Sequence, residues 1–122
     1  MAGVQPSETG DGPVSHAYLS RMRDAVGEAT LQRYAQGYLD LLPVRLARIG
    51  RAISADEAAE AEHVIVDLQI SSKMLGASRL AEKLAALESS LHAGLRPSAG
   101  QLAGIRAEAE LVAATVRGLT RS

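Results

Sequence analysis

The sequence predicts an all-α fold, an up-down antiparallel four-helix bundle with a short extra helix at its N-terminal end. The chain of 122 residues is rich in Ala, Leu, Arg and Glu, and its only aromatic side chains are Tyr18, Tyr34 and Tyr38. Strands favour aromatic and β-branched residues, so this composition argues against a sheet. Apolar residues instead recur every three or four positions, as in helices. The intervening loops are short, and short loops make consecutive helices antiparallel neighbours.

The N-terminal third divides into a tail and two predicted helices. Residues 1–13 contain three glycines and two prolines without apolar periodicity, which predicts a disordered tail before one helical domain at 14–120. Val14, Tyr18, Met22 and Val26 recur every four residues, predicting a short amphipathic helix. Apolar residues continue at helical spacing over 31–53. Because Pro43 removes a helix hydrogen bond at a cost of about 3 kcal/mol, we expect a helix kinked near 39–43, or two collinear pieces.

A third helix is predicted to begin at the capping box Ser54–Glu57, in which a serine and a glutamate three residues later satisfy free backbone amides. Gly76 is expected to end this helix. Its inward positions alternate in steps of three and four residues. They are Ala58, Ala61, Ile65, Leu68, Ser72 and Leu75.

Two further helices complete the predicted bundle. The fourth spans about 78–92, with Leu80, Leu84, Leu87 and Leu91 inward and Gly94 after its end. The last helix opens after Pro97 with a second capping box at 98–101. Its inward residues share the same helical spacing. They are Leu102, Ile105, Ala109, Val112, Val116 and Leu119.

Composition also bounds the function. A net charge of −1 gives no electrostatic reason to expect binding to nucleic acid or an anionic membrane. Without cysteine, disulfides and thiolate metal sites do not arise, and we expect a cytoplasmic protein without a metal or other cofactor. No run of 18 apolar residues is present, and the N-terminus lacks the pattern of a signal peptide.

The segment 65–77 reads IVDLQISSKMLGA, and it resembles the signature of histidine-containing phosphotransfer (HPt) domains. These domains are four-helix bundles that relay phosphoryl groups between the aspartates of receiver domains. The likeness covers about residues 14–120, including the order of the helices and the proline in the second helix. The matching positions are Leu68, Ser71, Ser72, Leu75, Gly76, Ala77, Leu80, Leu87 and Glu88.

The departures from this signature fall on the residues that carry the chemistry. The family's phospho-acceptor histidine corresponds to Val66, its lysine to Gln69, and the glycine that makes room for the receiver to Ile70. Phosphoryl transfer to such a helix requires an imidazole nucleophile and a nearby cation. Valine has no lone pair and glutamine no charge. The resemblance therefore implies a protein that is not an enzyme but binds a receiver domain or a histidine kinase and modulates a two-component phosphorelay.

The expected partner-binding surface is a stripe beside the inward positions of the third helix. It contains His63, Val66, Ile70 and Lys73, with Gln69 on its rim. In the family this face is open to solvent and meets the receiver. Exposed apolar groups rimmed by polar ones are typical of contact sites. The alternative is that a neighbouring helix covers Val66 and Ile70 as ordinary core.

Two other functions are compatible with the sequence. His63 could accept phosphate itself, although it lies one turn before Val66 and about 60° around the helix. The chain could also be a helical dimerisation or scaffold protein outside signalling, with the Val66–Ile70 patch as a homodimer interface. We interpret His63 and Asp67 as a weak surface ion pair and not as metal ligands. We interpret Ser71 and Ser72 as small residues that let helices approach closely, and not as nucleophiles.

Overall fold

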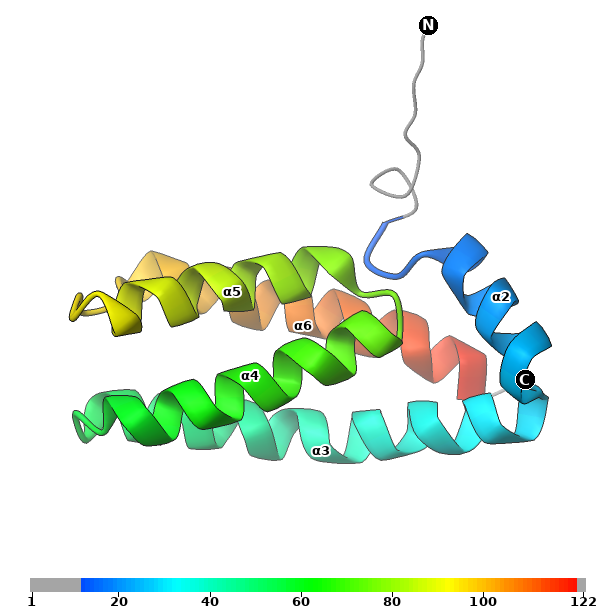
Figure 1. Ribbon diagram of the computed structural model, residues 1–122, viewed down its shortest axis with the longest axis horizontal. Helices are drawn as coiled ribbons and strands as arrows, with labels where there is room; N and C mark the ends of the chain where they lie inside the picture. The colour runs from blue at the N-terminus through cyan, green and yellow to red at the C-terminus, as the bar shows by residue number, and fades with distance from the viewer. Residues whose placement is uncertain (1–11, 121–122) are drawn as a thin grey trace, which may run out of the picture.

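The computed structural model describes residues 12–120, and within them every regular element is an α-helix (Figure 1). The all-α class is thus confirmed. The predicted tail lies, up to residue 11, outside the described residues. The helices are α2 (His16–Val26), α3 (Glu28–Ser54), α4 (Ala58–Met74), α5 (Ser78–His92) and α6 (Ala99–Thr120).

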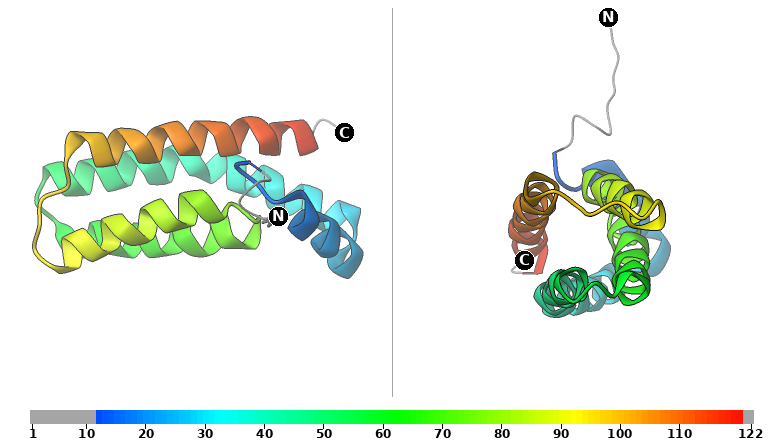
Figure 2. Two further views of the ribbon diagram at one scale, coloured as in Figure 1. Left: turned by 90° about the horizontal axis from the view of Figure 1, so that it is seen from above. Right: turned by 90° about the vertical axis from the view of Figure 1, so that its left-hand side faces the viewer.

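The four long helices pack side by side around a common core, and each runs opposite to the one before it (Figure 1). Helix α3 packs against α4 and α6, and α5 packs against the same two neighbours. Seen from the end, α4 and α6 lie diagonally across from each other (Figure 2). The short helix α2 lies at one end, where it contacts α3. This arrangement leaves the outer side of α4 free of any other long helix.

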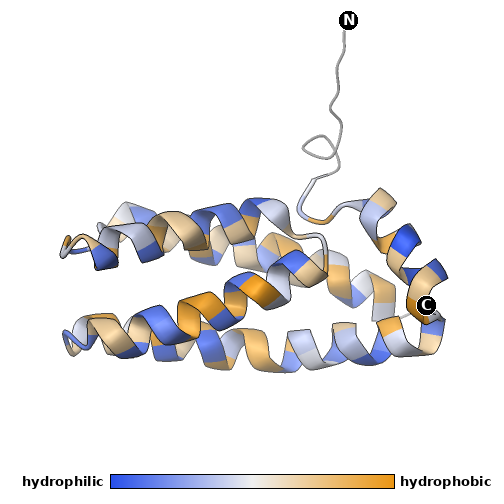
Figure 3. Ribbon diagram, viewed as in Figure 1, coloured by the Kyte–Doolittle hydropathy of each residue, from blue (hydrophilic) through white to orange (hydrophobic). Residues whose placement is uncertain are grey.

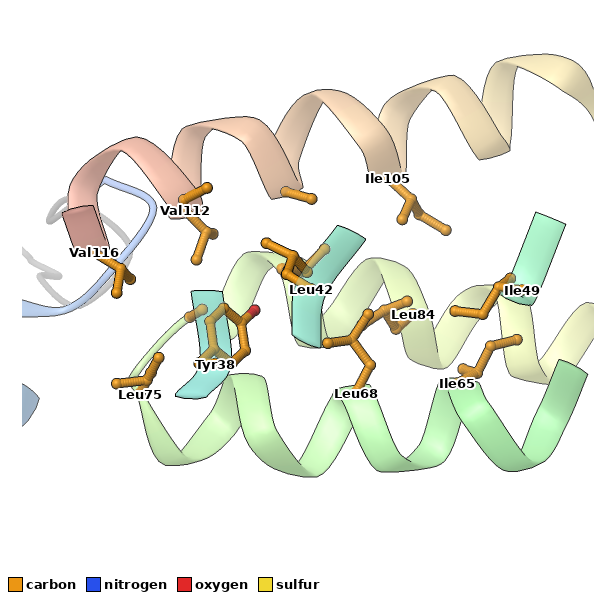
Figure 4. Close-up of a cluster of buried hydrophobic side chains, with 14 of the residues drawn as sticks. Tyr38, Leu42, Ile49, Ile65, Leu68, Leu75, Leu84, Ile105, Val112 and Val116 are labelled. Atoms are coloured by element: carbon orange, nitrogen blue, oxygen red, sulfur yellow. The ribbon is translucent and has the colours of Figure 1, made fainter. Parts of the chain in front are cut away.

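The core is formed by leucine, isoleucine and valine side chains that point inward from all four long helices (Figure 4). Leu68 of α4 and Leu84 of α5 are fully buried, and Leu42 of α3 lies close to them. Each such side chain stabilises the fold by about 1.5–3 kcal/mol. The inward positions predicted for α4 are buried except Ala58, which is exposed in the first turn.

Helix α3 is continuous from Glu28 to Ser54, with Pro43 inside it. Of the two expectations for this segment, the single helix is the one found. Pro43 is exposed. The missing N–H therefore leaves the carbonyl of Leu39 at the edge of the core, where water can satisfy it.

The capping box predicted at Ser54–Glu57 is wrong. Ser54 is the last residue of α3, and α4 begins only at Ala58 without a side-chain cap. The chain instead closes α3 with a Schellman turn, in which Glu57 N–H donates to Ala52 O at 2.8 Å and Asp56 N–H to Ile53 O at 3.1 Å. Asp56 adopts a φ of 61° at the position that usually carries glycine. These backbone hydrogen bonds hold residues 52–57 in the turn that ends α3, so Ser54 and Glu57 do not form the capping box.

The other predicted helix ends are confirmed. Gly76 and Gly94 follow α4 and α5 with φ values of 77° and 78°. Ser98 accepts a hydrogen bond from the Gln101 backbone N–H at 3.0 Å, which is the serine half of the second capping box. The turn at Gly76 also anchors the N-terminal segment, since Ser15 N–H donates to Gly76 O at 3.0 Å.

Candidate functional site

The candidate site is the outer face of α4, defined by His63, Val66, Gln69, Ile70 and Lys73 and called here the α4 face. The inward positions of α4 bury one side of the helix, so these five residues lie on or beside its opposite side. His63, Ile70 and Lys73 are exposed, whereas Val66 and Gln69 are half-buried. The alternative that both apolar residues are core is therefore wrong for Ile70, whose side chain is 54% exposed.

The apolar part of this face is longer than the sequence indicated. Met74 follows Ile70 by four residues and is 43% exposed, so Val66, Ile70 and Met74 form a ridge with one residue per turn. The middle of α4 is coloured hydrophobic in Figure 3, between hydrophilic residues. The sequence pattern did not assign Met74 to this face, because Met74 lies inside the SSKMLGA segment that resembles the phosphotransfer signature. The spacing of four residues from Ile70 was the signal that could have found it.

Polar contacts hold both flanks of the α4 face. Toward α5, the side chain of Gln69 donates from Nε2 to Glu88 Oε1 at 3.2 Å. Toward α3, Arg45 Nη1 donates to Ser71 Oγ at 3.0 Å. The position that would carry a cation in the family is thus a neutral amide engaged with a neighbouring helix, while the guanidinium of Arg45 brings a positive charge to the other flank. No pattern in the sequence pointed to Arg45, because its partner lies 26 residues away.

Ser71 and Ser72 are more than small spacers. Besides Arg45, Ser71 is contacted by Tyr34, whose hydroxyl donates to Ser71 O at 3.2 Å. Ser72 is fully buried, and its Oγ lies 2.8 Å from the hydroxyl of Tyr38. Burial raises the pKa of Tyr38, and the hydrogen bond to Ser72 offsets part of this shift. The two serines tie α4 to α3, and neither contacts a histidine–acid pair that could activate it as a nucleophile.

His63 is the only histidine of the α4 face, and its side chain is 71% exposed. Its Nε2 lies 3.8 Å from Asp67 Oδ2, which is beyond hydrogen-bond distance and weak at an exposed site. Across residues 12–120, no three His, Cys, Asp or Glu side chains gather closely enough to hold a metal ion. The geometry of His63 and Asp67 therefore matches the predicted weak surface ion pair.

The α4 face carries an aliphatic side chain at Val66, where the phosphotransfer signature has its acceptor histidine. An apolar ridge runs along this face, and Val66 has no atom that could attack phosphorus. His63, Gln69 and Lys73 rim the ridge, with the carboxylates of Asp67 and Glu88 beside two of them. No protein-family model matches the chain, and no curated protein or solved structure is significantly similar to it. In residues 12–120 no helix is both long and apolar enough to span a membrane.

Proposed function

We propose that this chain is a non-phosphorylatable HPt-like signalling protein. It binds a receiver domain or a histidine kinase of a cytoplasmic two-component pathway, and it modulates the phosphorelay by occupying that partner. The observation that carries the proposal is Ile70, a large apolar side chain 54% exposed where the phosphotransfer signature has glycine. A buried isoleucine at this position would only pack in the core, whereas an exposed isoleucine beside Val66 is available to contact a partner.

The helix arrangement supports the proposed scaffold. We interpret α3 to α6 as the up-down four-helix bundle of HPt domains, with α4 as the helix that would carry the histidine. The residues shared with the signature have structural roles in this chain, since Leu68 and Leu75 are buried and Gly76 forms the α4–α5 turn. The residues that differ lie on the α4 face. A scaffold kept for binding after the loss of its chemistry would have this distribution.

The ridge would contribute part of the binding energy of such a complex. Fully burying an isoleucine, valine or methionine side chain contributes about 1.5–3 kcal/mol. Because Val66 is already half-buried, Ile70 and Met74 have the most surface left to lose. Replacing Ile70 by aspartate should therefore weaken a receiver complex by about tenfold or more.

The binding prediction can be tested with purified receiver domains and histidine-kinase cores titrated into isotopically labelled protein. We expect amide shifts along α4 and at least a tenfold loss of affinity for Val66→Asp and Ile70→Asp. Leu111→Asp is the matched control, because Leu111 is 50% exposed but lies on the diagonally opposite helix α6. Unchanged affinity of both α4 variants would exclude the α4 face as the binding surface.

Phosphorylation distinguishes this proposal from its alternatives. When the chain is incubated with an autophosphorylating kinase, a receiver and labelled ATP, we expect no acid-labile phosphate on it. Phosphohistidine on the wild type that disappears in His63→Gln would assign an active relay to His63. A concentration-dependent dimer in sedimentation that Val66→Asp dissociates would instead support the scaffold protein.

A further inference from the structure

A second surface lies between α3 and α6, away from the α4 face. A groove of about 910 Å³ runs along this seam, and a hollow of about 560 Å³ continues it. The two share Pro43, Leu46 and Glu110 among their lining residues, so they form one elongated depression. It follows α3 from Leu39 to Ala55, which at 1.5 Å per residue is roughly 24 Å, or between four and five helical turns.

The floor of the groove is apolar, and part of it lies close to the helix backbone. Pro43, Leu46 and Ala47 line it, and Gly50 has no side chain to fill it. A Cβ atom at Gly50 would lie 3.6 Å from Arg106 Nη2. The guanidinium of Arg106 therefore extends across the seam from α6 over the backbone of α3. A positive charge is thus held at the edge of an apolar channel with helical walls.

Charges of alternating sign follow the groove. Arg51 and Arg106 lie at one end, Glu110 lies along α6, and Arg117 lies in the continuing hollow with Asp40 beside it. Within residues 12–120, none of the three arginines forms an ion pair with a carboxylate. By contrast, Arg23, Arg48 and Arg79 are all paired. Arg51, Arg106 and Arg117 are therefore available to an external acid, as are, among the described residues, the unpaired Arg21, Arg33, Arg45 and Arg96 outside the groove.

We propose that the groove binds an amphipathic helix of a partner protein that presents carboxylates to Arg106 and Arg117. The groove has the length of a short helix and walls made by two helices, into which the ridge of a third can pack. The two arginines are eleven residues apart, so the matching carboxylates lie about 16 Å apart along the partner helix. Glu110 and Asp40 disfavour a uniform polyanion such as nucleic acid or an anionic membrane, whose charges are all of one sign. The inference does not depend on the proposed function of the α4 face.

The test uses a designed helical peptide of 18 residues as the probe. One face carries leucine and alanine, flanked by two glutamates eleven residues apart with a lysine between them. A control peptide has the opposite charge at all three positions. Phosphatidylglycerol vesicles and a 20-nucleotide single-stranded DNA test the two other anionic surfaces. We expect the glutamate peptide to bind, with the largest amide shifts at Ala47, Gly50 and Ala113, and to bind at least tenfold more tightly than its control.

Charge reversal in the protein identifies the contact. Arg106→Glu and Arg117→Glu should each lower affinity for the glutamate peptide at least tenfold and raise it for the control peptide. Arg33→Glu, on the exposed surface of α3 outside this groove, should change either affinity less than twofold. No binding at millimolar peptide, equal affinity for both peptides, or tighter binding to vesicles or DNA would overturn the proposal. A self-association in sedimentation that Arg106→Glu abolishes would also overturn it, by assigning the groove to a second copy of the chain.

Discussion

Val66 and Ile70 lie one turn apart on the outer side of α4, and neither carries an atom that could accept phosphate. Gln69 between them donates to Glu88 and carries no charge. One substitution back to histidine would supply the nucleophile but not the cation, and Ile70 would still occupy the space that the phosphotransfer signature leaves open. Under the proposed function, the departure from phosphotransfer chemistry is therefore distributed over three side chains, and the exposed part of Ile70 would offer a partner the apolar surface that glycine lacks.

The tyrosines of α3 make stability depend on pH in the alkaline range. Burial raises the pKa values of both Tyr34 and Tyr38 above their ordinary value of 10.0. Above that pH the unfolded chain releases these protons while the folded chain retains them, so the free energy of unfolding should fall as the pH rises past about 10. Urea midpoints measured from pH 8 to 11 check the sign, and Tyr34→Phe/Tyr38→Phe should show a shallower decline. An equally steep decline in the double variant would assign the effect to other groups.

At the scale of elements, the α4–α5 turn depends on glycine for two separate reasons. Gly76 has a φ of 77°, and a Cβ there would lie 2.9 Å from Tyr18 Cδ2 on α2. Gly94 has a nearly equal φ but no atom within 4 Å of a Cβ. Alanine at either site costs about 1–2 kcal/mol of left-handed strain, and only Gly76→Ala adds an overpacking cost of about 1–3 kcal/mol. Urea unfolding should therefore rank Gly76→Ala as clearly less stable, and equal losses would show that α2 does not press on the turn.

Two serines with the same sequence pattern differ in their structural role. Ser98 accepts from the Gln101 amide at the start of α6, whereas Ser54 is the last residue of α3. Ser98→Ala should lower the free energy of unfolding by about 0.5–2 kcal/mol through the lost cap. Ser54→Ala, the matched control, should change it by less than about 0.5 kcal/mol, as is usual at exposed positions. A larger loss at Ser54 would mean that the capping box forms in solution.

Periodicity was sufficient to predict the helices and most of their inward positions, because a helix that packs on one side must repeat its apolar residues every three to four positions. It could not predict the end of α3, where backbone bonds around Asp56 compete with the Ser54–Glu57 pattern. Nor could it predict Arg45–Ser71 or Tyr38–Ser72, since those contacts depend on how α3 and α4 are aligned along each other. The α4 face was located from the sequence, but the exposure of Ile70 and the addition of Met74 required the packed structure.

For the molecule as a whole, the helices separate two outward surfaces with different chemistry. The α4 face is an apolar ridge, and the seam between α3 and α6 is an apolar groove with unpaired arginines at its edge. Because α4 and α6 lie diagonally across the core (Figure 2), one partner on each surface would not collide with the other at the helices themselves. If both proposals hold, the chain could modulate a pathway by holding two components together or by blocking one of them.

The central proposal is most directly tested by restoring the three missing residues and measuring phosphoryl transfer. The triple variant Val66→His, Gln69→Lys and Ile70→Gly should accept acid-labile phosphate from a phosphorylated receiver domain, while the wild type should remain unlabelled. This result would show that the helices form a phosphotransfer scaffold from which only the reactive residues have been lost. A folded triple variant that stays unlabelled, or a wild-type chain that becomes labelled, would contradict the proposal.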